Sequence, residues 1–288
     1  MVYVRKNVKA LSGSERKRFV DAVLRLKRSG RYDEFVRTHM EFYTADGDRG
    51  LRVAHMTPSF LPWHRLFLLD FERALRAVDS SVTVPYWDWT AERSASAVPW
   101  SKDLLGGNGR AGDRRVTTGP FAHATGNWTL RHNVTDERYL VRDFGHPPEG
   151  LTLPTAAELA VAERESGYDV EPWDSTSASG FRNNLEGWRT RQGQARWRNH
   201  NKVHRWVGGT MLGGASVNDP VFWLHHSFVD LVWSRWQRKH PDARYLPARP
   251  PLPGTRQYRR IVGRDQPMPP FDLPPSEAED HRRVYRYA

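Results

Sequence analysis

The sequence holds 12 histidines, and the placement of several of them suits metal binding. His200 and His204 are four residues apart on a predicted helix, so both project from one face. His225 and His226 follow in a second helical stretch that is strongly apolar, DPVFWLHHSFVDLVW. Unpaired imidazoles are costly to bury in such a helix. At least one of these two histidines therefore needs a metal or a fixed hydrogen-bond partner.

A second set of histidines lies in the N-terminal half of the chain. His64 sits in the apolar helical stretch SFLPWHRLFLLDFERAL, His39 lies on the preceding predicted helix, and His55 lies in the loop between them. Each of these alone has an ordinary explanation as a hydrogen-bonded core residue. Together with the first set they form two groups of three, on four helices and one loop. A helical bundle with inward-facing ligands is a known way to hold two metal ions.

The residue types narrow the choice of metal. The chain has no cysteine, and no carboxylate interleaves with the histidines at ligand spacing. Sites made only of imidazole suit copper, and suit zinc less specifically. Three nitrogens per ion leave coordination positions open for a small ligand. Two adjacent cuprous ions could each give one electron to dioxygen, so we expect two copper ions with O2 as co-substrate.

The hydrophobic pattern predicts a mainly α fold, with a four-helix-bundle core, long loops and a few short strands. The region 92–154 is rich in Gly, Asn and Thr and is expected to form long loops. A short buried strand, interrupted by Pro85, is expected over 82–89. The expected helices cover 14–29, 32–42, 59–78, 154–166, 177–188, 199–207 and 218–240.

Composition supports one folded domain over residues 1–288. An apolar fraction of 38% and an aromatic fraction of 12% argue against disorder. Nine of the 20 prolines lie between Pro247 and Pro275, so residues 246–288 are expected to form an extended strap on this domain. The net charge of +11 comes mostly from dispersed arginines and carries no nucleic-acid-binding signature. The sequence predicts neither a membrane-spanning helix nor a signal peptide.

Seven segments of the chain resemble the bacterial tyrosinases, a family of type-3 dicopper proteins. The most specific of them are PSFLPWHRLFLLDFERAL at 58–75 and NDPVFWLHHSFVD at 218–230. The others are RKN at 5–7, RSGRYDEFVRTH at 28–39, VPYWDW at 84–89, GFRNNLEGW at 180–188 and NHNKVHRWVGG at 199–209. The resemblance extends from near the N-terminus to about Tyr245 and therefore covers most of the chain.

The resemblance implies which histidines bind which ion. His39, His55 and His64 would hold the first copper, and the second would be held by His200, His204 and His226. His226 is chosen because the second histidine of the NDPVFWLHH motif is the family ligand, so His225 would lie behind the ligands. Phe222 and Asp230 share a helix face with His226, and Asp230 is expected to orient an imidazole or tie helices together.

The resemblance also implies a base near the second copper. Glu186 and Asn201 would together hold a water that takes a proton from a phenol, whose pKa is about 10. Read on their own, these residues are an ordinary solvated carboxylate and a helix-capping amide. The basic spacer GWRTRQGQARWRN at 187–199 is longer than the family pattern and could displace Glu186.

Two residues near the ligands depart from melanin-forming relatives. Arg205 directly follows His204 and could meet a substrate carboxylate or carbonyl, and Tyr43 lies four residues after His39. An ordinary surface arginine is the alternative for Arg205. We assign both residues to substrate binding. The absence of Cys excludes the Cys–His thioether of some fungal relatives.

The expected activity is that of a tyrosinase, which hydroxylates monophenols at the ortho position and oxidises o-diphenols to o-quinones. An o-aminophenol oxidase of secondary metabolism could use the same site. A haemocyanin-like O2 carrier and a dizinc hydrolase are more distant alternatives. Family members often need a small companion protein that delivers copper. The chain is accordingly expected to be cytoplasmic, or to be exported only with such a companion.

Overall fold

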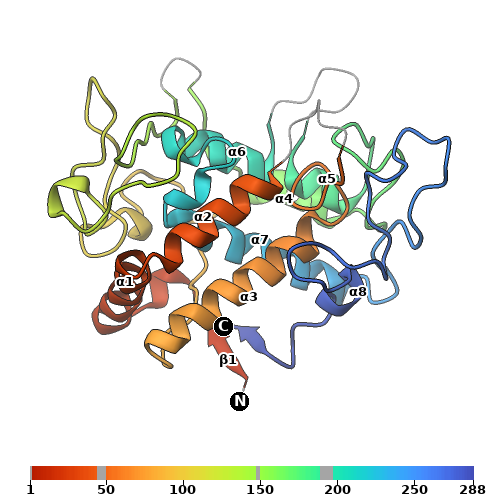
Figure 1. Ribbon diagram of the computed structural model, residues 1–288, viewed down its shortest axis with the longest axis horizontal. Coiled ribbons are helices and arrows are strands. Elements are labelled where there is room, and N and C mark those ends of the chain that lie inside the picture. The colour runs from red at the N-terminus through yellow and green to blue at the C-terminus, as the bar shows by residue number, and fades with distance from the viewer. Residues whose placement is uncertain (1, 44–49, 147–149, 189–196) are drawn as a thin grey trace.

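Helices dominate the fold, and the mainly α prediction is confirmed (Figure 1). The computed structural model describes residues 2–43, 50–146, 150–188 and 197–288. The helices are α1 (Gly13–Arg28), α2 (Arg31–Phe42), α3 (Phe60–Val78), α4 (Ala156–Glu163), α5 (Phe181–Glu186), α6 (Asn199–Val207), α7 (Val221–Lys239) and α8 (Pro275–Ala278), and the strands are β1 (Tyr3–Arg5) and β2 (Tyr285–Tyr287).

The centre of the fold consists of α2, α3, α6 and α7, the four helices on which ligands were predicted. α3 packs along α7, α1 packs on both α2 and α3, and α6 contacts α5 and α7. Both long helices are buried on most sides, because α3 and α7 each carry Trp, Phe and Leu around most of their circumference. Figure 1 shows α7 passing behind α2 and α3 in the middle of the molecule.

Local sequence signals explain where several helices begin and end. The Ser12 hydroxyl accepts a hydrogen bond from the Glu15 amide, and the Glu15 carboxylate accepts one from the Ser12 amide, so α1 begins with a capping box. The predicted helix over 177–188 is shorter in the structure. Gly180 and Gly187 flank α5 with φ of 99° and 87°, conformations that suit only glycine and end the helix on both sides.

The strand predicted over 82–89 is wrong. Within this segment the ladder is limited to one isolated bridge, between Tyr86 and Asn7. The Trp87 amide instead donates to the carbonyl of Leu224 on α7, at 3.0 Å. Pro85 has no amide hydrogen to offer a ladder, so the apolar run is buried against a helix rather than in a sheet.

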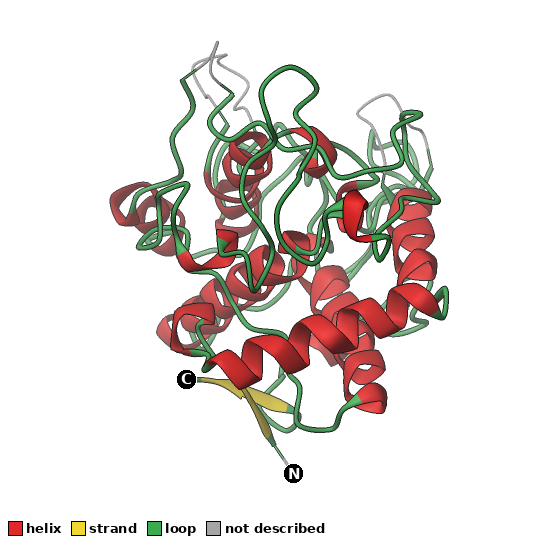
Figure 2. Cartoon of the chain, turned by 90° about the vertical axis from the view of Figure 1, so that its left-hand side faces the viewer, coloured by secondary structure: helices red, strands yellow, loops and turns green. Residues whose placement is uncertain are grey.

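The two ends of the chain meet on the side of the molecule opposite many of the long loops (Figure 2). β1 and β2 pair in parallel, with Tyr3 opposite Tyr285 and Arg5 opposite Tyr287. The C-terminal segment is therefore more than an extended strap, since it includes α8 and ends in a strand. No described helix is long and apolar enough to cross a membrane. The single-domain organisation stays a prediction.

Candidate functional site

The N-terminal histidines converge in the structure. α2 supplies His39, α3 supplies His64, and His55 comes from the loop that precedes α3. One potential ligand nitrogen from each lies within 4.8 Å of the others, and all three side chains are buried. The segments far apart in sequence thus form the group of three that the spacing predicted.

The second group lies directly beside the first. His200 and His204 share one face of α6, and α7 brings His225 and His226 to them, again with ligand atoms within 4.8 Å. The Nε2 atoms of His204 and His226 are 3.4 Å apart. Two nitrogens on one tetrahedral ion, with bonds of about 2.0–2.1 Å, have a separation of about 3.4 Å. This pair therefore has the spacing of two ligands to one metal.

His226 and His225 occupy different positions relative to the two groups. The His226 ring stacks on His64 of the first group, with centroids 4.2 Å apart, and lies 4.9 Å from His200. The His225 ring stacks on the other side of the second group, 5.0 Å from His200 and 6.3 Å from Trp89. His226 therefore lies between the groups, whereas His225 lies behind one of them.

Backbone carbonyls fix the orientation of four of the imidazoles. Each accepts a hydrogen bond from the Nδ1 of one ring, which leaves the lone pair on Nε2. The pairs are His39 with Gly214 (2.6 Å), His64 with Phe60 (2.9 Å), His200 with Glu186 (3.3 Å) and His204 with Met211 (2.7 Å). The Nε2 atoms of His39, His64 and His200 have no partner among the described residues.

The environment keeps these rings neutral and suited to metal binding. Burial lowers the pKa of His39 and of His204 to about 4. Burial and the neighbouring imidazoles lower the pKa values of His55, His64, His200 and His226 as well. Buried nitrogens with no hydrogen-bond partner are costly unless something binds them. A purely nitrogen donor set fits copper better than it fits calcium or magnesium.

A pocket of about 250 Å³ opens over the histidines. It is smaller than the roughly 300–1,000 Å³ of sites for drug-sized ligands, so it suits a single aromatic ring. Residues of both groups reach it, His55 from the first and His200 and His204 from the second. The other lining residues are Tyr43, Trp188, Trp197, Asn201, Arg205, Met211, Leu212, Gly213 and Ser216.

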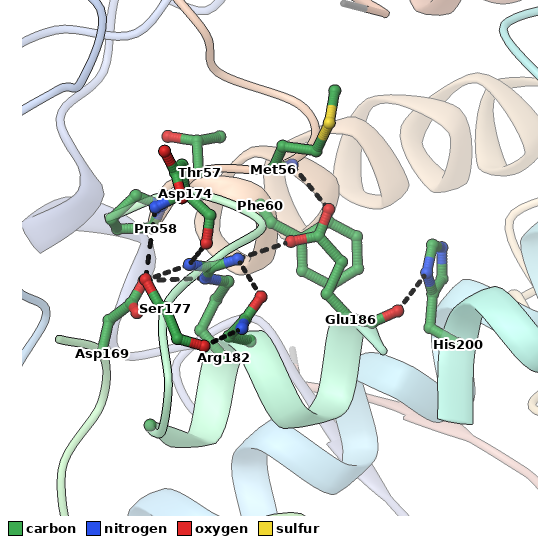
Figure 3. A network of polar contacts seen from close by, with 12 residues as sticks. Met56, Thr57, Pro58, Phe60, Asp169, Asp174, Ser177, Arg182, Glu186 and His200 are labelled. Atoms are coloured by element: carbon green, nitrogen blue, oxygen red, sulfur yellow. Dashed lines mark hydrogen bonds and ion pairs between the residues drawn. The ribbon is translucent and has the colours of Figure 1, made fainter. Parts of the chain in front are cut away.

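Only one member of the predicted water-holding pair is among the residues that line the pocket. Asn201 lines the pocket, but the buried Glu186 is not among the lining residues. One Glu186 oxygen accepts from the Met56 amide at 2.6 Å, and the other accepts from the Arg182 guanidinium at 2.9 Å (Figure 3). Burial raises the pKa of Glu186, although Arg182 opposes this. The joint role of Glu186 and Asn201 stays a prediction.

Comparison with known proteins shows the family of this chain. Residues 29–239 match the family model described as the common central domain of tyrosinase. The chain belongs to the tyrosinase family. It is 50% identical over 285 residues to a tyrosinase of Streptomyces glaucescens, and the alignment covers 99% of this chain and 98% of that protein. It is 41% identical over 319 residues to grixazone synthase of Streptomyces griseus, covering 100% and 99% of the two chains.

Solved structures agree with this membership of the tyrosinase family. A polyphenol oxidase variant from Thermothelomyces thermophila superposes with a TM-score of 0.62 at 25% identity, covering 86% of this chain and 74% of that one. A functional unit of octopus haemocyanin superposes with a TM-score of 0.60 at 23% identity, covering 99% and 68%. The second likeness shows that the fold is shared.

Sequence reasoning missed two tryptophans in the pocket wall of this tyrosinase-family chain. Trp188 and Trp197 meet edge to face, with ring centroids 5.5 Å apart, and the Arg205 guanidinium lies 5.0 Å from the centre of the Trp197 ring. Both tryptophans belong to the 187–199 spacer, of which residues 189–196 lie outside the described residues. The signal that could have indicated them was the presence of two tryptophans in an otherwise basic and polar segment.

A buried ionic cluster connects the two long helices of the tyrosinase-family core. Asp230, one turn after His226 on α7, receives Arg65 from α3 at 2.5 Å and Arg5 from β1 at 3.2 Å. Arg5 also pairs with Glu72 on α3 at 2.8 Å. These contacts tie helices together, as predicted for Asp230. They fix α3 and α7 relative to each other next to His64 and His226.

Proposed function

We propose that this chain binds two copper ions and uses O2 to hydroxylate monophenols at the ortho position and to oxidise o-diphenols to o-quinones. One observation carries the proposal. Two groups of neutral imidazoles, all buried except the half-buried His204, lie side by side and open together into a pocket with room for one ring. The relatives named tyrosinase support the same activity.

We assign His39, His55 and His64 to the first copper, and His200, His204 and His226 to the second. The 3.4 Å separation of the His204 and His226 Nε2 atoms supports the choice of His226 over His225. When bound, the copper pair would supply the electrons that reduce O2. The carbonyls that accept from Nδ1 hold four of these imidazoles so that Nε2 faces the metal positions.

The pocket residues would orient the phenol. Tyr43 and Trp188 offer aromatic surface, and Asn201 places an amide next to His200, where it could bind the phenol oxygen or a water that takes its proton. Arg205 would meet a polar substituent on the ring. The buried tryptophans and phenylalanines around the histidines exclude bulk water from the metals.

Oxidation of an o-aminophenol is the second candidate. Arg205 and Tyr43, the two residues that the sequence analysis assigned to substrate binding, both line the pocket. One relative, 41% identical to this chain, is named grixazone synthase and not tyrosinase. A haemocyanin-like carrier is a weaker candidate. The pocket reaches the surface at Leu212, which is 46% exposed, so a substrate has access.

The test is O2 uptake by copper-loaded protein with tyrosine, its o-diphenol and an o-aminophenol at matched concentrations. The metal-free protein and His204→Ala serve as controls. Uptake with tyrosine supports the proposal, whereas uptake confined to the o-aminophenol supports the second candidate. Reversible oxygenation without turnover would contradict both. If metal analysis showed that zinc alone supports activity, a hydrolase would be favoured instead.

A small companion protein would deliver the copper, as the family resemblance implies. The site determines where this companion protein would release the copper. The histidines lie beneath a pocket whose exposed lining residues are Leu212 and Gly213, so a donor would release copper there. Copper loading of the purified chain by copper salts alone, at the rate seen in cells, would contradict this part of the proposal.

A further inference from the structure

His55 is the one proposed ligand of the six that no helix holds in place. The other five lie on helices, whereas His55 lies in the loop before α3. Its Nδ1 has no hydrogen-bond partner among the described residues, unlike the Nδ1 atoms of His39 and His64. No thioether can restrain it either, because the chain has no cysteine. Something else must hold this loop.

The backbone directly after His55 is in an unfavourable conformation. Met56 has φ of 56°, in the left-handed region that side chains with a Cβ rarely adopt. A buried residue keeps such a conformation only when its surroundings hold it there. The contact at Met56 itself is the hydrogen bond from its amide to Glu186 Oε1, at 2.6 Å. The flanking loop is also held by the Ser59 hydroxyl on the Val53 carbonyl and by the Tyr168 hydroxyl on the Pro58 carbonyl.

Glu186 contacts the second group as well. Its main-chain carbonyl accepts from the Nδ1 of His200, at 3.3 Å. One residue thus touches the backbone beside a ligand of the first group and the ring of a ligand of the second group. The two rings that it holds, His55 and His200, have centroids 6.3 Å apart across the boundary between the groups. Figure 3 shows Glu186 between Met56 and His200.

The remaining carboxylate oxygen is held from behind. Arg182, one turn earlier on α5, donates to Glu186 Oε2 at 2.9 Å and to Asp169 at 2.7 Å. Its other contacts go to the carbonyl of Asp174 and the side chain of Asn183, and all of these residues are buried. A carboxylate fixed by a main-chain amide and a fully bonded guanidinium has little freedom to move.

We propose that Glu186 is a positioning residue that sets the separation of the two metal sites by tying the His55 loop to His200. Its carboxylate holds the strained backbone at Met56, and its carbonyl orients the His200 ring. This role differs from that of a base acting on a pocket water, because the Glu186 carboxylate contacts Met56 and Arg182, and neither of these residues lines the pocket. The inference rests on the proposed function only in treating both histidine groups as metal sites.

Crystal structures of metal-free Glu186→Ala and Glu186→Gln test the proposal without any dependence on activity. Ala removes the acceptor for the Met56 amide, and we expect the His55 ring to move away from His200 by about 1 Å, a displacement that can lower turnover about 100-fold. Gln keeps one oxygen for the Met56 amide but turns its NH2 towards the Arg182 guanidinium, so the separation should change less than in Glu186→Ala. The Arg182–Asp169 pair remains in both variants, so no buried charge is left without a partner.

The matched control is Glu158→Gln. Glu158 pairs with Lys202 on the same helix as His200, at 2.7 Å, but that pair does not reach the His55 loop. A further variant, Glu186→Ala with Met56→Gly, should recover part of the separation, because glycine accepts the left-handed conformation without support.

The loaded protein provides the second measurement. Wild type and variants are filled with copper, and the copper content and copper–copper distance are measured by X-ray absorption. We expect two coppers in wild type and Glu158→Gln, and a longer or broadened distance in Glu186→Ala.

An unchanged ring separation in Glu186→Ala would overturn the proposal. If monophenol turnover then fell alone in both Glu186 variants, Glu186 would be a base. A wild type that binds no copper pair would overturn the proposed function, while the metal-free structures would still decide the role of Glu186.

Discussion

Replacing Arg5 by methionine should destabilise the whole core, although Arg5 lies near the N-terminus. Its guanidinium is fully buried, pairs with Glu72 at 2.8 Å and Asp230 at 3.2 Å, and lies 3.6 Å from the centre of the Tyr285 ring. Methionine fills much of the same volume but carries no charge. Glu72 would lose its cation and keep the Val84 amide, whereas Asp230 would keep Arg65.

The size of the effect follows from these contacts. Removing one partner of a buried ion pair costs about 3–5 kcal/mol, because the other charge remains buried without compensation. For 288 residues the entropy of unfolding is about 0.6 kcal/mol per kelvin, at roughly 2.1 cal/mol/K per residue. The melting temperature of Arg5→Met should therefore fall by about 5–8 °C.

Thermal unfolding of metal-free protein gives the measurement, because bound copper would add its own stabilisation. Arg16→Met is the matched control. Arg16 forms an ion pair with Asp103, whose side chain is 55% exposed, and such pairs contribute little. Equal melting temperatures for Arg5→Met and Arg16→Met would refute the reasoning. Arg5→Lys should fall between them, because it keeps the charge but loses the bidentate geometry.

Three further predictions concern the site and its support. His226→Ala should bind one copper and His225→Ala should bind two, as measured by metal analysis; equal losses would refute the choice of ligand. Burial would raise the pKa of Asp230, but the two arginines lower it to about 2. The ionised carboxylate therefore stabilises the fold by about 2 kcal/mol above pH 4, and this stabilisation is lost as the pH falls towards 2. Urea unfolding of the metal-free protein should lose less stability over this range in Asp230→Asn than in wild type, and parallel losses would contradict the pKa. Asn201→Asp should change monophenol turnover more than diphenol turnover, and parallel changes in the two rates would exclude Asn201 from handling the phenol proton.

The long helices were predictable because their signals are local. The apolar stretches around His64 and His226 and the capping box at Ser12 act over a few residues, and α3 and α7 follow them closely. The segment 82–89 was not predictable in the same way. A short apolar run satisfies both a strand and a segment packed on a helix, and its partner, Leu224, lies far away in sequence.

The sequence by itself determined the chemistry available to this protein: an all-imidazole set of candidate donors, four helices on which five of the six proposed ligands lie, and no thiolate. These features follow from residue type and helical spacing. Only the tertiary structure decided how the donors are held. It gave four imidazoles their carbonyl partners, put His226 between the groups, and brought the Glu186 carboxylate into contact with Met56 and Arg182. Such contacts join residues up to 175 positions apart, as in His39 and Gly214, and no local pattern encodes them.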